Sequence, residues 1–172
     1  MPSEDPRNPV STPSALGPSP GGRFRGRYTH TLDKKGRVSL PSRYREALQS
    51  RNEDVLVLSA GDGGLVAYPQ AEWSKLEDDA LNRPQHNEKV LNYMRTILAS
   101  GIECPVDAQG RILIPPDMRS LAELKDKVLF VSMINRFEIW NVDRFNQRFA
   151  PTPERIGEAE SHMDRMDEKN GS

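Results

Sequence analysis

The stretch that decides the fold is TLDKKGRVSLP, residues 31–41, because the chain repeats its frame as PVDAQGRILIP at residues 105–115. Each copy has Asp, two variable residues, Gly-Arg, three residues of which the first and last are apolar, and then Pro. The two aspartates, Asp33 and Asp107, lie 74 positions apart in the sequence. A unit that recurs with its whole frame predicts an internal duplication.

The segments around the two turns follow the same order of elements. Alternating apolar residues predict a strand at 28–32 before the first turn and at 102–106 before the second. After each turn a short strand ends at Pro41 or Pro115. A short helix follows, which Ser42 is expected to cap in the first copy. Two further strands complete each copy, at 55–58 and 65–68 and again at 128–133 and 137–140.

Helices are expected to join the two copies. Segments 70–81 and 87–100 have helical periodicity, Pro84 separates them, and Gly101 is placed to end the second. The second segment carries an amphipathic stripe, which we expect to cover the sheet, formed by Val90, Leu91, Met94, Ile97 and Leu98. Trp73, in the first linking helix, corresponds in position to Phe145 after the second copy.

Composition favours a soluble, intracellular protein. The chain has 172 residues, 35% of them apolar, and its mean hydropathy is −0.70. A single cysteine, Cys104, excludes an internal disulfide, and no apolar run has the length of a membrane span or of a signal-peptide core. We therefore expect no membrane partner.

Charge is unevenly distributed along the chain. The net charge is −1, but residues 23–51 hold nine Arg or Lys against two acids, so this segment carries +7 and the remainder −8. Such segregation can direct an anionic partner to one face. Charge alone leaves open whether the basic segment is a solvated face or a binding surface.

The repeats predict one body rather than two separate domains. One copy alone is too small to bury its apolar face, so the two are expected to cover each other around a pseudo-two-fold axis in an interleaved, barrel-like body. The predicted organisation is a disordered Pro-rich tail at 1–22, a first repeat at 23–73, connecting helices at 74–100, a second repeat at 101–146, and an acidic tail or helix at 147–172.

The repeated turn carries one residue that turn chemistry leaves unexplained. Asp can accept backbone N–H groups at the start of a turn, and Gly can take a positive φ. Neither requirement explains why an arginine, Arg37 or Arg111, directly follows the glycine in both copies. Across such a turn Asp33 can pair with Arg37, which would present the guanidinium to an anion or a base edge.

The segments TLDKKGRVSLPSRYREAL, PVDAQGRILIPPDMRSLA and NRFEIW resemble the MraZ family of bacterial transcriptional regulators. The resemblance covers residues 24–145. It implies an α+β fold of two tandem AbrB-like repeats, joined as one pseudo-two-fold swapped-hairpin β-barrel with connecting helices. It also implies a cytoplasmic, nucleoid-associated repressor that binds short G-rich direct repeats in double-stranded DNA, upstream of the division and cell-wall gene cluster including its own gene. A ring-shaped homo-oligomer is implied as well.

Carried over by position, the resemblance places the DNA-facing residues on the two hairpins. These are Asp33, Gly36 and Arg37 in the first and Asp107, Gly110 and Arg111 in the second. The basic residues Arg25, Arg27, Lys34 and Lys35 add candidates on the first side only, since the second turn has Ala108 and Gln109. We therefore expect the first hairpin to contribute more to DNA affinity.

Two other function classes fit the sequence less well. The same barrel could serve as an oligomeric protein-interaction or antitoxin-like scaffold without specific DNA readout. An enzyme is disfavoured, because the three histidines are scattered and no metal-ligand spacing, phosphate-binding glycine loop or nucleophile elbow occurs. No cofactor, metal or catalytic residue is expected.

Overall fold

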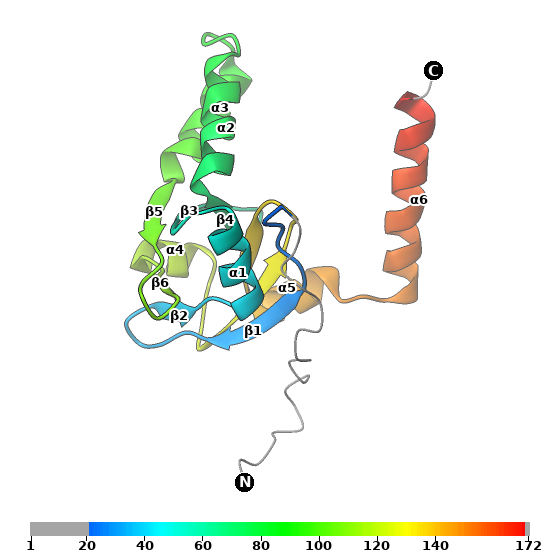
Figure 1. The fold of residues 1–172 in the computed structure, drawn as a ribbon. Coiled ribbons are helices and arrows are strands. Elements are labelled where there is room, and N and C mark those ends of the chain that lie inside the picture. Colours follow the sequence, from blue (N-terminus) through cyan, green and yellow to red (C-terminus); the bar gives the residue numbers. More distant parts are fainter. Residues whose placement is uncertain (1–20, 171–172) are drawn as a thin grey trace.

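The computed structural model describes residues 21–170, in which the two repeats have the same series of elements (Figure 1). The first consists of β1 (Arg27–Thr31), β2 (Arg37–Ser39), α1 (Ser42–Ser50), β3 (Val55–Ala60) and β4 (Leu65–Pro69). The second consists of β5 (Ile102–Pro105), β6 (Arg111–Leu113), α4 (Pro116–Leu121), β7 (Lys127–Ser132) and β8 (Phe137–Asn141). The predicted tail at 1–22 lies almost wholly outside the described residues.

The repeats exchange strands within one antiparallel sheet. Its order is β1-β7-β8-β4-β3-β5, so the first strand of each repeat pairs with the third of the other. At the centre β4 pairs with β8, with Val66 opposite Glu138. Exchanging the equivalent strands of the two repeats gives the same order read from the other end. The predicted pseudo-two-fold axis requires this symmetry. Strands β1 and β5 are the two ends of this order, so strand pairing leaves the sheet open and does not by itself close the predicted β-barrel.

The second strands of the two repeats form a separate two-stranded ribbon. Strand β2 pairs antiparallel with β6, and Val38 stands directly opposite Ile112. Both side chains are buried, while the residues on either side of them face outward, as the two-residue period of a strand requires. The ribbon therefore has one core face and one outer face.

The core draws on both repeats. Tyr44 is fully buried and its ring meets Phe24, Phe130 and Phe137 at centroid distances of 5.3, 6.0 and 4.8 Å. Its hydroxyl donates a 2.7 Å hydrogen bond to the Gly26 carbonyl, which satisfies the polar end of the ring. Each such side chain contributes about 1.5–3 kcal/mol on burial. Because the cluster spans the repeats, neither repeat has a complete core of its own.

The linking helices α2 (Gln70–Leu81) and α3 (Glu88–Thr96) form an arm that extends from the body (Figure 1). The stripe residues on α3 are half-buried, and α3 extends with the arm away from the sheet, so the prediction that the whole stripe covers the sheet is wrong. The helix stops at Thr96, and a 3-10 turn, η1 (Leu98–Ser100), continues it. Hydrogen bonds from Ser59 Oγ to the Ile97 carbonyl and between the Ser59 and Ser100 hydroxyls, both 3.1 Å, hold this turn against β3.

The start of α1 and the end of the α3–η1 segment lie close to where the sequence predicts them, but the residues there act differently from the prediction. Helix α1 begins at Ser42 itself, with Pro41 in the capping position, so Ser42 does not act as a cap. Gly101 does end the helical segment, but at an ordinary φ of −63°. A side chain at Gly101 would overlap the ring of Trp73, so close packing rather than a left-handed turn requires glycine there.

The C-terminal region is helical. Helix α5 (Val142–Phe149) places Phe145 as the counterpart of Trp73, and both rings are buried. Helix α6 (Pro153–Asn170) stands away from the body (Figure 1). The acidic segment predicted as a tail or helix is thus a helix over the residues that the structure describes.

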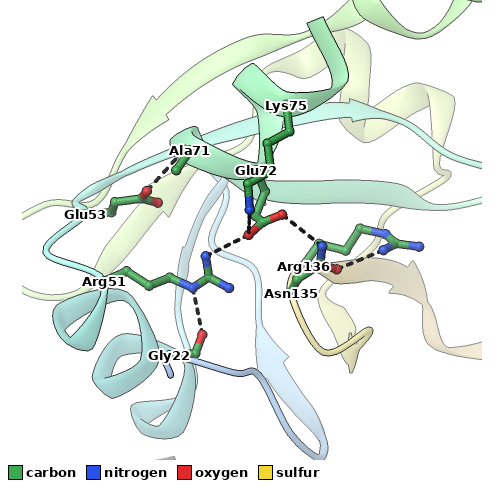
Figure 2. A network of polar contacts seen from close by, with 8 residues as sticks. All are labelled: Gly22, Arg51, Glu53, Ala71, Glu72, Lys75, Asn135 and Arg136. Carbon is green, nitrogen blue, oxygen red and sulfur yellow. Dashed lines mark hydrogen bonds and ion pairs between the residues drawn. The ribbon is translucent and has the colours of Figure 1, made fainter. Parts of the chain in front are cut away.

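A polar network joins the end of α1, the start of α2 and the β7–β8 turn (Figure 2). The Glu72 carboxylate accepts hydrogen bonds from Arg51, Lys75 and Asn135 at 3.0–3.2 Å. Burial raises the pKa of Glu72, and these donors outweigh burial and lower it on balance. Arg51 also donates to the Gly22 carbonyl at 2.7 Å, which fixes the entry of the chain.

The second repeat holds the same position with the charges reversed. Counting from the equivalent strands β4 and β8, Arg144 occupies the place of Glu72, and Glu123 lies just after α4 as Arg51 lies just after α1. Arg144 and Glu123 form an ion pair at 3.5 Å, but the Glu123 side chain is 66% exposed against 12% for Glu72. The two copies thus keep an ion pair at one place and differ in how deeply they bury it.

Candidate nucleic-acid interface

The two Asp-x-x-Gly-Arg turns have the same hydrogen bonds. We call residues 33–37 tip 1 and residues 107–111 tip 2. In tip 1, Asp33 Oδ1 accepts from the Lys35 and Arg37 backbone N–H groups at 2.9 and 2.8 Å, and Oδ2 accepts from Arg37 Nε at 2.9 Å. Tip 2 repeats all three contacts within 0.1 Å, from Gln109 N, Arg111 N and Arg111 Nε to Asp107.

These contacts confirm the predicted Asp–Arg pairing and show how it works. The backbone N–H of Arg37 is the main reason that the pKa of Asp33 lies below its usual range, and the Arg37 guanidinium adds to the effect. The Arg111 backbone N–H acts in the same way on Asp107. Both carboxylates are therefore ionised at neutral pH. Each holds its arginine through Nε, so this contact does not use the two terminal nitrogens of the guanidinium.

The glycine of each tip takes a backbone conformation that other residues avoid. Gly36 and Gly110 have φ values of 87° and 76°. Each glycine carbonyl accepts a hydrogen bond from the other repeat, Gly36 from Ile114 N at 2.8 Å and Gly110 from Leu40 N at 2.9 Å. The tips are thus fastened to the two opposite ends of the β2–β6 ribbon.

Strand register brings the two arginines onto one face. Arg37 stands opposite Leu113, and Arg111 stands opposite Ser39. All four face away from the buried Val38 and Ile112. Arg37 and Arg111 are diagonal neighbours across the ribbon, a relation that separates residues by about 7–8 Å. Of the candidate residues, Asp33, Arg37, Asp107 and Arg111 therefore lie along this face, whereas Gly36 and Gly110 are buried.

The other predicted basic residues divide into two groups. Lys34 and Lys35 lie on tip 1 and are exposed. Arg25 and Arg27 lie at the opposite end of β1, and Arg27 is separated from Asp33 by six residues, or roughly 20 Å of extended chain. The Arg27 guanidinium lies 5.7 Å from the centroid of the Phe145 ring on α5. The structure thus does not bring this pair to the tip.

Two arginines that sequence reasoning did not select do lie at the tips. A side chain built on Gly36 would come within 2.8 Å of Arg119 Nε, and one built on Gly110 would meet Arg45. Arg45 is on α1 and Arg119 on α4, so each tip is backed by an arginine from the other repeat. Their 74-residue separation equals that of Arg37 and Arg111, so the same repeat comparison could have found them.

The described residues contain neither of two other kinds of site. Over residues 21–170 no group of three or more His, Cys, Asp or Glu is placed to hold a metal ion. Within the same range no helix has the length and apolar character needed to cross a membrane.

Comparison with known proteins identifies the family. A family model described as "MraZ protein, putative antitoxin-like" matches twice, at residues 23–92 and 97–166. The chain belongs to the MraZ family. The double match agrees with the two strand-exchanged repeats.

Curated MraZ proteins cover most of the chain. It is 41% identical over 121 residues to the transcriptional regulator MraZ of Thioalkalivibrio sulfidiphilus, a match that spans 70% of this chain and 81% of the relative. Identity to the regulator of Syntrophobacter fumaroxidans is 43% over 118 residues, or 69% and 79% of the two chains. The regulator of Pediococcus pentosaceus is 35% identical over 140 residues, or 81% and 96%. The predicted resemblance to the MraZ family is confirmed.

Proposed function

We propose that the protein is a non-enzymatic transcription regulator that binds double-stranded DNA through the outer face of the β2–β6 ribbon and its two tips. The observation that carries the proposal is the pair of identically held guanidinium groups, Arg37 and Arg111, on one exposed face. The names of the relatives support the regulatory role.

The ribbon suits a major groove in both size and chemistry. The groove is about 12 Å wide and admits a two-stranded ribbon. With Nε held by Asp33, the terminal nitrogens of Arg37 can donate to O6 and N7 of one guanine. Leu113, 54% exposed beside Arg37, offers an apolar contact of the kind that thymine methyl groups accept. Lys34 and Lys35 contact phosphates and set the position of the tip.

The finer function follows from the family resemblance. The proposed targets are short G-rich direct repeats upstream of the division and cell-wall gene cluster, including the protein's own gene, where it acts as a repressor in the cytoplasm on the nucleoid. The strand exchange between repeats supports assignment to the AbrB-type swapped-hairpin folds. We extend the proposal to a ring-shaped homo-oligomer, since several weakly binding tips on repeated sites gain affinity through effective concentration.

The decisive measurement is binding to DNA from immediately upstream of the protein's own gene, with scrambled DNA of equal length at matched salt. We expect tighter binding to the native sequence. Arg37→Ala should weaken binding by about 1–3 kcal/mol and reduce the preference. Arg37→Lys keeps the charge but loses the forked donor, so it should restore affinity for scrambled DNA without restoring the preference.

Arg83→Ala is the matched control, since Arg83 pairs with Asp79 on the arm and lies outside the proposed interface. Equal affinity of the wild type for both DNAs would overturn the specific-regulator proposal.

A protein-interaction scaffold is the second candidate. Exposed apolar residues on α6 favour it, namely Ile156, Met163 and Met166, which are 49–61% exposed. Phosphate binding falls steeply with salt and apolar association does not. If partner capture by the protein is insensitive to salt and unaffected by Arg37→Ala, the scaffold function is the correct one.

A further inference from the structure

A groove lies beside tip 1, between that tip and the segment that leads from α4 into β7. Both repeats line it: tip 1 contributes Lys34, and the second repeat contributes Arg119, Ser120 and Lys125. Lys34, Ser120 and Lys125 are exposed. Three cationic side chains from two different repeats therefore meet at one depression next to the proposed base-reading residue.

Arg119 is the unusual member of this set. Its guanidinium is packed against Gly36, and its Nε is buried with no hydrogen-bond partner. Within the part of the chain that the structure describes, no carboxylate pairs with it. Its charge is thus held in place by tip 1 and is not neutralised by the protein, an arrangement that favours an incoming anion.

The acids around the groove are mostly engaged elsewhere. Asp33 is bound to Arg37 at 2.9 Å, and Glu123 pairs with Arg144 at 3.5 Å. Asp126 is the remaining carboxylate on the lining. The lining thus holds three cations, Lys34, Arg119 and Lys125, against three carboxylates, and two of those carboxylates are already paired with arginines that lie outside the lining.

The first repeat lacks these cations at the equivalent positions. Aligned on the tips, Lys34 corresponds to Ala108 and Ser120 to Glu46; aligned on β3 and β7, Lys125 corresponds to Glu53, whose carboxylate accepts from the Ala71 N–H at the start of α2. Only the arginine is kept, as Arg45, and Glu46 is part of an ion pair with Arg43 at 3.6 Å. The cationic set is thus a property of one tip, and the shared turn chemistry does not require it.

We propose that the groove beside tip 1 binds a backbone phosphate of DNA, with Arg119 and Lys125 as the main cations and Ser120 as a hydroxyl donor. The inference rests on the proposed function, because it concerns the same DNA complex. Tip 1 then has a phosphate anchor that tip 2 lacks. The anchor fixes how deeply the ribbon enters the groove while Arg37 reads the base.

Lys125→Ala is the primary test, because Lys125 is exposed and its replacement leaves the fold intact. Loss of one phosphate contact should weaken binding to native and scrambled DNA by the same factor, about 3–10-fold at low salt, and reduce the slope of log K against log salt by about 1. Arg119→Gln should act in the same direction, with circular dichroism as the check on folding. Lys89→Ala on the distant arm is the matched control and should leave the slope unchanged.

The outcomes separate this inference from the proposed function. If Arg37→Ala reduces sequence preference while Lys125→Ala behaves like Lys89→Ala, the phosphate anchor is wrong and the regulator proposal stands. If wild-type protein does not discriminate between the two DNAs, the proposed function fails whatever Lys125→Ala does.

A titration with inorganic phosphate at constant ionic strength, followed by the amide signals of Ser120 and Lys125, separates the two possible sources of phosphate. Shifts of those signals together with a Lys125→Ala effect on DNA support the anchor. Shifts without an effect on DNA show a site for small anions and overturn the proposal.

Discussion

Tip 1 and tip 2 share every hydrogen bond of the Asp-x-x-Gly-Arg turn but differ in the charge around it. Tip 1 has two lysines and an adjoining groove lined by three cations, whereas tip 2 has Ala108 and Gln109, and Glu46 stands at the sequence position equivalent to Ser120. The conformation of the turn is thus independent of the charges next to it. In this chain the duplication preserves the presentation of an arginine and leaves the surroundings free to diverge.

The largest expected effect tests whether the two glycines are equally constrained. Gly36→Ala should lower the free energy of unfolding by about 2–3 kcal/mol, since the added methyl would lie 2.8 Å from the Ile114 carbonyl oxygen as well as at a positive φ. At Gly110 the nearest atoms all belong to the flexible Arg45 side chain, so Gly110→Ala should cost about 1–2 kcal/mol. Urea unfolding measures both. A larger loss at Gly110 would contradict the difference in packing.

The next effect concerns DNA affinity. Arg37→Ala should weaken binding by about 1–3 kcal/mol, and Arg111→Ala by less than about 1 kcal/mol, since tip 2 is not supported by neighbouring lysines. Fluorescence anisotropy with one DNA at one salt concentration compares the two variants. Equal losses would show that both tips read DNA alike despite their different charges.

A third effect compares the contributions of the two ion pairs, Arg51–Glu72 and Arg144–Glu123, to stability. Arg51→Ala removes a half-buried guanidinium that contacts Glu72 and the Gly22 carbonyl, and should destabilise the fold by about 1–2 kcal/mol. Arg144→Ala breaks a pair whose acid is largely exposed and should cost less than about 1 kcal/mol. Thermal unfolding of both variants checks the order. A reversed order would mean that the network of Figure 2 contributes little.

The smallest effect should be identical in both tips. The pKa values of Asp33 and Asp107 are lowered, first by the backbone N–H of their own arginine, so ionisation of these groups stabilises the turns above the ordinary carboxyl pKa of 3.8. That stabilisation is lost as pH falls through the lowered values. Carboxyl NMR titration should give two similar pKa values below 3.8. A normal value at one tip would show that its Asp–Arg pair is absent in solution.

Repetition in the sequence was sufficient to predict the order of elements and the Asp–Arg pairing. Both follow from local chemistry, since Asp33 contacts residues only two and four positions away. The positions of Arg45 and Arg119 could also be predicted in principle, because they repeat at the same interval as Arg37 and Arg111.

Long-range placement was less predictable. The amphipathic stripe of α3 indicates that one face is apolar but does not say what covers it, and the helix lies in the arm rather than on the sheet. Arg25 and Arg27 have the right charge for the interface, yet the length of β1 carries them away from tip 1. Periodicity predicts which face of a segment is apolar. The distance between two segments depends on the whole fold.

The exchange of strands between repeats also has a consequence during synthesis. Strand β1 pairs with β7, and their nearest paired residues, Thr31 and Lys127, are separated by 96 positions. At translation rates of about 5–20 residues per second, β1 waits roughly 5–20 s for its partner. During that interval another nascent chain of the same protein, translated from the same message, can offer an equivalent β7. Ribosome spacing can thus influence whether the strands pair within one chain or between two.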